Sequence, residues 1–276
     1  VHKCVTGNTI IYTEQGMKRI DSLVQPNQYK NETRNIDINI YGRNGLEKCT
    51  QIYKGNVEKT IVLTTSFGYR IEGSYKHPIL TFDHEEKWTK LPDIKIGDCI
   101  ILQRGTQCFG QNISTKIYRK CINNMADCTI PEIIEEKLGY MIGVLIGIEL
   151  SINKFDSDII DTFQSFSEEI FKVRFKIYDC ENKNTVKLTV NSKQIRHFFF
   201  WCGLKYDLTC EKSIPWVIMQ NDRKTQIECL KGLFDTNGSV DKSCVYFTAT
   251  SRLLASDVQT LLLNIGIISS LKELTG

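Results

Sequence analysis

Short apolar runs follow one another closely in the first third of the chain, separated by Gly, Asn and Pro residues. This pattern is typical of strands joined by turns. The polar stretch at residues 25–35 predicts a loop. The predicted strands span residues 9–13, 35–42, 60–66, 69–73, 77–82 and 98–104. We therefore expect residues 4–104 to form an all-β domain.

The pattern changes in the second half. Residues 105–129 show no sustained period and are expected to be a connector. Residues 131–147 predict a helix, because Pro131 falls in its first turn and three glutamates lie near its positive end. Further helices are predicted at 157–171, 192–203, 225–238 and 251–266, and further strands at 173–179, 185–190, 244–250 and 267–274.

The order of these elements repeats. The series that starts near Gly143 restarts near Gly232, about 90 residues later. The repeat predicts an α+β domain with internal pseudo-twofold symmetry in residues 130–276. Its last strand, at 267–274, has no hairpin partner of the kind found in the first copy, so we expect this domain to be truncated at its C-terminal end.

Composition narrows the class of protein. The chain has 276 residues, 41% of them hydrophobic, which is enough to bury a core in one or two domains. Its longest apolar run, residues 138–152, is too short and too interrupted to span a bilayer, and no secretory signal pattern opens the chain. We expect a soluble, cytoplasmic (intracellular) protein with no membrane partner. The 11 cysteines include no C-x-x-C pair, so no metal site is predicted.

The charge is unevenly distributed. Residues 1–129 carry 18 Lys and Arg against 13 Asp and Glu, a net charge of +5, whereas residues 130–276 carry 17 against 19, a net of −2. Because a phosphate backbone is held by Lys and Arg, the second half is poorly suited to bind DNA.

Two short motifs lie about seventy residues apart. The first is CVTGNT from Cys4, and the second is GSYKHPI, which contains Ser74 and His77 and precedes the strand IKIGDC. In this order they resemble the blocks of inteins, the self-splicing elements with the Hint fold: C-x-x-G-D/N-T, then T-x-x-H-P-I/L, then K-V/I-G-D. Ser74 stands where threonine is commoner. The resemblance covers residues 4–104 and implies a Hint-like splicing domain.

The resemblance implies an autocatalytic, single-turnover reaction at the Lys3–Cys4 junction. Cys4 would attack the Lys3 carbonyl carbon and move the acyl group from nitrogen to sulfur as a thioester. His77 would protonate the leaving nitrogen, and Ser74 would offer its hydroxyl to the transient oxyanion. Residues 1–3 are then either a remnant of the flanking host protein, the N-extein, or cloning residues.

Three glycines, Gly139, Gly143 and Gly147, share one face of the predicted helix and would let another helix approach closely. The stretches MIGVLIGIE, from residue 141, and LKGLFDTNG, from residue 230, resemble the repeated motif of LAGLIDADG homing endonucleases, which are often nested in inteins. In that family, an acidic residue five after the motif glycine holds a divalent metal in each copy. This chain has Ile148 and Asn237 there. The resemblance therefore implies a nuclease that has lost its activity.

These resemblances lead to one main prediction and two alternatives. The family's later splicing blocks are not found in the chain. We therefore expect an N-terminal intein part that joins a complementary C-terminal fragment. We also expect that it needs no cofactor and contacts DNA weakly. One alternative is an active endonuclease that uses shifted carboxylates and Mg²⁺. The other is an endonuclease domain kept only as a scaffold for association of the intein fragments.

Overall fold

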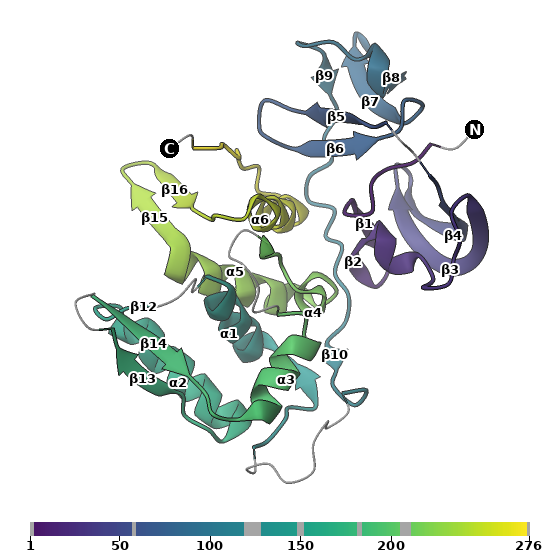
Figure 1. Ribbon diagram of the computed structural model, residues 1–276. Helices are drawn as coiled ribbons and strands as arrows, with labels where there is room; N and C mark the ends of the chain where they lie inside the picture. The colour runs from purple at the N-terminus through teal and green to yellow at the C-terminus, as the bar shows by residue number, and fades with distance from the viewer. Residues whose placement is uncertain are drawn as a thin grey trace. The chain divides into compact units, whose positions relative to one another are not determined.

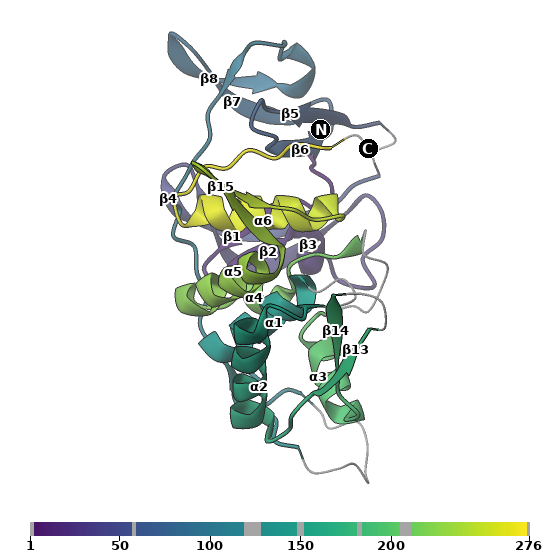
Figure 2. The ribbon, with the colours of Figure 1, turned by 90° about the vertical axis from the view of Figure 1, so that its left-hand side faces the viewer.

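The chain divides into two compact units in the computed structural model (Figures 1 and 2). Val1–Cys108 and Gln259–Gly276 form the first, and Phe109–Val258 form the second. The structure describes residues 3–56, 59–118, 128–147, 152–180, 184–204 and 211–274. None of the helices in these ranges is long and apolar enough to cross a membrane.

A four-stranded antiparallel sheet, in the order β2-β1-β3-β4, opens the first unit. Its elements are β1 (Ile10–Thr13), β2 (Gly16–Arg19), the 3-10 turn η1 (Ile20–Leu23), β3 (Glu32–Gly42) and β4 (Gly45–Lys54). A bulge between Asn35 and Ile38 interrupts the β3–β4 pairing. Because β3 begins at Glu32, the predicted loop at residues 25–35 is too long.

Two smaller sheets complete the strands of this unit. β5 (Ile61–Thr64) pairs with β6 (Arg70–Gly73), and β7 (Pro78–Asp83) pairs with β8 (Glu85–Lys90) and β9 (Cys99–Ile100), with the 3-10 turn η2 (Leu91–Asp93) between β8 and β9. All six predicted strands of residues 9–104 are confirmed in part or in full. β2, β4 and β8 were not predicted, since charged residues interrupt their apolar pattern.

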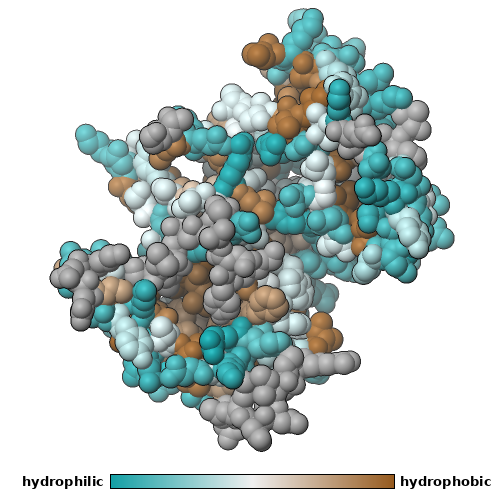
Figure 3. Space-filling model, in the orientation of Figure 1, coloured by the Kyte–Doolittle hydropathy of each residue, from teal (hydrophilic) through white to brown (hydrophobic). Residues whose placement is uncertain are grey.

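The sheet β8-β7-β9 has one covered and one open face. Thr81 is buried, whereas Phe82 and Trp88 are 51% and 62% exposed. Leu80 lies opposite Trp88, so these apolar side chains share the open face. Figure 3 shows the apolar residues at the surface over these strands. This face therefore leaves a large apolar area in contact with solvent.

The end of the chain joins the first unit without forming the predicted strand at 267–274. Leu271 N–H donates to the Phe67 carbonyl at 3.0 Å, in the turn between β5 and β6. The buried Gln259 amide donates to the same carbonyl at 2.9 Å and to that of Ser269 at 3.0 Å. The Asn264 side chain bonds the backbone N–H and carbonyl of Cys108. The unit is thus not made of residues 4–104 alone, and it includes a helical segment.

The second unit alternates helices with small antiparallel sheets. Its sheets have the orders β10-β11, β12-β14-β13 and β15-β16. The elements are β10 (Ile113–Ser114), β11 (Ile133–Ile134), α1 (Glu136–Gly147), β12 (Ile152–Asn153), α2 (Ser157–Phe171), β13 (Lys176–Asp179), β14 (Thr185–Thr189), α3 (Lys193–Trp201), α4 (Trp216–Met219), α5 (Arg223–Asn237), β15 (Gly238–Asp241), β16 (Cys244–Phe247) and α6 (Arg252–Asn264), whose last residues belong to the first unit. The predicted helix at 131–147 is wrong at its start, because residues 133–134 pair with β10 instead.

Helices α1 and α5 pack against each other through glycines, as the sequence predicted. A Cβ atom added at Gly143 would overlap the carbonyl of Cys229, and one added at Gly232 would overlap that of Tyr140. A Cβ at Gly139 would lie 2.7 Å from the Thr225 carbonyl oxygen. The two motif helices therefore approach at a distance that any side chain at these positions would prevent.

Candidate functional site

The first motif lies beside the end of β6. Val5 forms an antiparallel bridge with Gly73, and Thr6 N–H donates to the Glu72 carbonyl at 3.0 Å. Ser74 N–H donates to the Cys4 carbonyl at 2.9 Å. The backbone thus brings Cys4 next to the second motif, 70 residues away in the sequence.

Ser74 contacts the backbone nitrogen of Cys4. Its Oγ accepts a hydrogen bond from Cys4 N–H at 3.1 Å, and the side chain is buried. This nitrogen belongs to the peptide bond between Lys3 and Cys4. A hydroxyl group therefore lies on the nitrogen side of that bond.

His77 faces the other residue of the same bond. Its backbone is fixed in the turn after β6, where His77 N–H donates to the Ser74 carbonyl at 2.9 Å and its carbonyl accepts from Leu91 at 3.0 Å. Burial lowers the pKa of the imidazole, an interaction with the Lys3 backbone raises it, and the Lys3 charge lowers it further. The net result is a lowered pKa, so the ring is neutral at neutral pH.

The His77 ring lies close to the backbone of the junction, because a Cβ atom added at Gly73 would lie 3.0 Å from the Cys4 carbonyl oxygen and 3.2 Å from Cγ of His77. The upward effect of the Lys3 backbone on the His77 pKa is the effect that a carbonyl oxygen has on an imidazolium. Nδ1 of His77 is buried without a hydrogen-bond partner. In the neutral ring that donates through Nε2, Nδ1 can therefore take a proton without breaking another hydrogen bond.

The Cys4 thiol is half-buried. Burial raises its pKa, so the sulfur is protonated at neutral pH. A nucleophilic role requires removal of this proton during attack, because the thiolate is the reactive form. The neutral imidazole of His77 belongs to the same group of contacts and can accept that proton.

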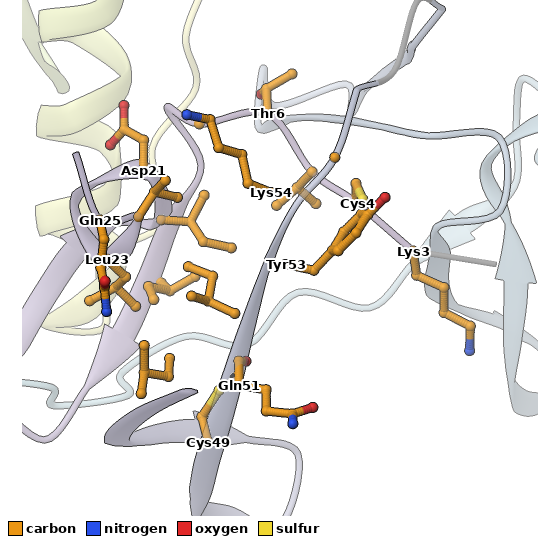
Figure 4. A pocket seen from close by; sticks show the side chains of 18 of the residues that line it. Lys3, Cys4, Thr6, Asp21, Leu23, Gln25, Cys49, Gln51, Tyr53 and Lys54 are labelled. Carbon is orange, nitrogen blue, oxygen red and sulfur yellow. Dashed lines mark hydrogen bonds between the residues drawn. The ribbon is translucent and has the colours of Figure 1, made fainter. Parts of the chain in front are cut away.

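A cavity of about 800 Å³ opens beside Cys4 within the first unit. Figure 4 shows Cys4, Tyr53 and Lys54 at one end of it and Cys49 and Gln51 at the other. Its apolar lining consists of Val5, Ile11, Ile20, Leu23, Val24, Pro26, Ile36, Ile40 and Ile52. The thiol therefore borders a largely apolar space of the size that ligand sites occupy.

The LAGLIDADG resemblance places metal ligands at Ile148 and Asn237, the two positions that the sequence predicts to be degenerate. Ile148 is outside the described residues. Asn237 ends α5, where its Nδ2 donates to the Thr248 carbonyl at 3.3 Å and its Oδ1 is buried without a partner. A Cβ at Gly147 would lie 2.7 Å from that Oδ1, so the amide lies beside the last turn of α1.

These residue types do not fit a divalent metal ion. Mg²⁺ takes oxygen ligands, chiefly carboxylates, whereas the sequence supplies an isoleucine and a neutral amide. Asp235, a candidate substitute, accepts a hydrogen bond from the Tyr140 hydroxyl at 3.0 Å. Across the described part of the chain, no group of three His, Cys, Asp or Glu side chains could hold a metal ion.

A lysine that the sequence reasoning missed lies at the same helix end. Lys212 Nζ donates to the Ile146 carbonyl at 2.7 Å, in the last turn of α1. A cation there interacts favourably with the negative end of the helix. No local pattern could have revealed this contact, since 66 residues separate the two partners.

Comparisons with known proteins agree with the resemblance of residues 230–238 to the LAGLIDADG motif. Residues 224–275 match the family model described as a LAGLIDADG-like domain. This match is consistent with a homing endonuclease domain. The match crosses the boundary at residue 258 and includes the segment that packs in the first unit.

Two curated relatives align along nearly the whole chain. The replication factor C small subunit of Methanocaldococcus jannaschii is 26% identical over 99% of this chain and 14% of its own length. A DNA gyrase subunit of Mycobacterium gordonae is 22% identical over 96% of this chain and 49% of its own length. The chain therefore spans half or less of the length of each relative.

Proposed function

We propose that this chain is the N-terminal part of an intein and that Cys4 carries out an N-to-S acyl shift at the Lys3–Cys4 junction. The observation that carries the proposal is the position of Ser74 and His77 on either side of one peptide bond. Ser74 Oγ meets the Cys4 nitrogen at 3.1 Å, and His77 faces the Lys3 backbone. We propose that Cys4–Cys108 and Gln259–Gly276 together form the splicing domain, of Hint type.

In the proposed reaction, the Cys4 sulfur bonds to the Lys3 carbonyl carbon and the bond from that carbon to the Cys4 nitrogen breaks. The thiol proton passes to the nitrogen, which becomes a free amine, so the step needs no outside reactant. His77 acts first at the carbonyl oxygen, which it polarises, and relays the proton. The Ser74 hydroxyl turns from acceptor to donor as the nitrogen gains a lone pair.

This assignment exchanges the roles expected from the motifs. The sequence led us to place His77 at the nitrogen and Ser74 at the oxyanion. The contacts of the resting state favour Ser74 at the nitrogen and His77 at the oxygen. Both versions require the same three side chains.

The relatives support an element that inserts into different host proteins. One relative is named for replication factor C and the other for DNA gyrase, yet each aligns with more than nine-tenths of this chain. Two proteins with such different names are expected to share a segment if it is a mobile element. They are not expected to share it if the segment served the function of either host protein. Flanking host sequence is then the other substrate of the junction.

We propose that the LAGLIDADG-like half no longer cleaves DNA. Its two metal positions carry Ile148 and Asn237, and the neighbouring Asp235 carboxylate is engaged by Tyr140. Weak DNA contact is compatible with the net charge of −2 in residues 130–276. A role of this half as a scaffold for the splicing domain is favoured by helix α6. Within this helix, the Gln259 side chain donates a hydrogen bond to the Phe67 carbonyl of the first unit.

The later steps of splicing need an asparagine and a second nucleophile. We propose that a complementary C-terminal segment supplies them, on the same or another polypeptide. The apolar cavity beside Cys4 would receive part of that segment, because apolar surface of this extent is favourable to cover.

The test is incubation of the chain with a strong thiol, followed by intact-mass spectrometry. The expected result is loss of residues 1–3 from the unsubstituted chain and no loss after Cys4→Ala. Cys49→Ala is the matched control, since Cys49 lines the same cavity at its other end. Release that survives Cys4→Ala would contradict the proposal.

A further inference from the structure

The segment after β4 forms a wall against the Cys4 sulfur. A Cβ atom added at Gly55 would lie 3.2 Å from Cys4 Sγ and 3.1 Å from Cε1 of Tyr53. The sulfur and the tyrosine ring therefore border the same small space, and both line the cavity (Figure 4). Ordinary contacts between such atoms are about 3.5–4.0 Å, so Gly55 leaves room that no other residue would.

Asn31 holds this wall with three hydrogen bonds, two that it accepts and one that it donates. Its Oδ1 accepts from the Tyr53 hydroxyl at 2.9 Å and from Asn56 N–H at 3.2 Å. Its own N–H donates to the Lys54 carbonyl at 2.6 Å. One residue thus fixes the strand end on both sides of Gly55, and its φ of 62° is a conformation that asparagine tolerates.

We propose that Asn31, through Tyr53 and Gly55, positions the Cys4 thiol for attack on the Lys3 carbonyl. The three are positioning residues that act on the sulfur and not on the reacting bond. This inference rests on the proposed acyl shift. It adds a requirement that the two motifs do not contain, since residues 31 and 53–56 lie outside both.

The physical reason is rotamer selection. A cysteine side chain has three staggered χ1 wells, and attack on the preceding carbonyl is open only to a well that turns the sulfur toward it. We infer that the segment at Gly55 restricts the χ1 angles that the Cys4 side chain can adopt. Misplacement of a reacting group by about 1 Å can slow a reaction about a hundredfold.

The decisive experiment compares Asn31→Gly with Asn31→Asp in the full chain. Both replacements tolerate the left-handed conformation, but only aspartate keeps the oxygen that Tyr53 and Asn56 contact. Thiol-induced loss of residues 1–3 is expected to slow about three- to tenfold in Asn31→Gly, because the strand end loses the two hydrogen bonds that hold Tyr53 and Asn56 in place. Asn31→Asp should restore the rate to within about twofold.

Gly55→Ala provides a second test that does not depend on weakened folding. Gly55 is outside the left-handed region, so alanine adds no backbone strain, and a cooperative thermal unfolding transition is the check that the Gly55→Ala chain is folded. Release should nevertheless slow by about tenfold or more, because the methyl group displaces the sulfur. Alkylation of Cys4, mapped by mass spectrometry, should not slow in parallel, since it does not need the attack rotamer.

Each outcome decides one of the two claims. Release from the unsubstituted chain that stays equally fast in Asn31→Gly and Gly55→Ala overturns the positioning role and leaves the acyl shift intact. Equal slowing in Asn31→Asp and Asn31→Gly also overturns it, because the retained oxygen would then have no effect. No release from the unsubstituted chain overturns the proposed function, and the positioning role with it.

Discussion

Replacing Ser74 with alanine removes the hydroxyl oxygen that lies 3.1 Å from the Cys4 nitrogen. The backbone bond from Ser74 N–H to the Cys4 carbonyl stays in place, so the chain path near the junction is expected to persist. The change therefore isolates one side-chain contact at the reacting bond.

The expected loss follows from the burial of this contact. A buried donor left without its acceptor costs about 1–3 kcal/mol, and removal of one hydrogen-bonding group from a reaction site slows catalysis about 10²–10³-fold in a well-studied protease. Because the Ser74 hydroxyl is buried but the Cys4 residue is only half-buried, we expect a smaller effect than in that protease, a decrease of about 10- to 100-fold in the rate of the acyl shift.

The assay is the rate of thiol-induced loss of residues 1–3, followed by intact mass. Ser74→Thr is the matched control, because threonine carries the same hydroxyl and stands at this position in the motif that the chain resembles. It should react within a few-fold of the unsubstituted chain. A folded Ser74→Ala chain that reacts at the full rate would refute the reasoning about the nitrogen contact.

Four further predictions follow from single contacts. The lowered pKa of His77 means that the unfolded state binds more protons as the pH falls below 6.5, so the unfolding midpoint should drop there, and His77→Gln should flatten that drop in thermal scans. Gln259→Ala removes two partly buried hydrogen bonds, to the Phe67 and Ser269 carbonyls, and should lower the free energy of unfolding by about 1–3 kcal/mol in denaturant titrations. An unchanged midpoint would contradict a stabilising role of these bonds. Gly143→Ala should cost about 1–3 kcal/mol by overlap with α5, measured in the same way against an exposed-site alanine. Paired Ile148→Asp and Asn237→Asp changes should create Mg²⁺ binding detectable by calorimetry, whereas equal binding by the unsubstituted chain would contradict the account of the metal positions.

Local patterns predicted most elements of the fold but not what each element pairs with. Residues 267–274 alternate like a strand, yet Leu271 bonds the turn at Phe67, because a strand needs a partner that the pattern cannot specify. Residues 133–134 have a helical context but pair with β10, since a contact across some twenty residues outweighs local preference. β8 was not predicted, because Glu85, Glu86 and Lys87 leave it without the apolar run that marked the other strands.

The site divides in the same way. Motif spacing selected Cys4, Ser74 and His77, and the structure places the Ser74 hydroxyl within hydrogen-bond distance of the Cys4 nitrogen, while the catalytic roles of the three stay a prediction. Spacing could not tell which group meets the nitrogen and which the carbonyl, because that depends on the turn after β6. The contacts of Asn31 depend on long-range pairing, and no motif marks them.

The central claim is that the Cys4 sulfur displaces its own backbone nitrogen from the Lys3 carbonyl. Incubation with hydroxylamine at neutral pH, followed by tandem mass spectrometry of the small product, tests it directly, because hydroxylamine attacks a thioester and leaves peptide bonds intact. The account predicts a tripeptide of residues 1–3 that carries a hydroxamate on the Lys3 carbonyl and disappears with Cys4→Ala. A product that ends in a free carboxylate, or an intact chain, would contradict it.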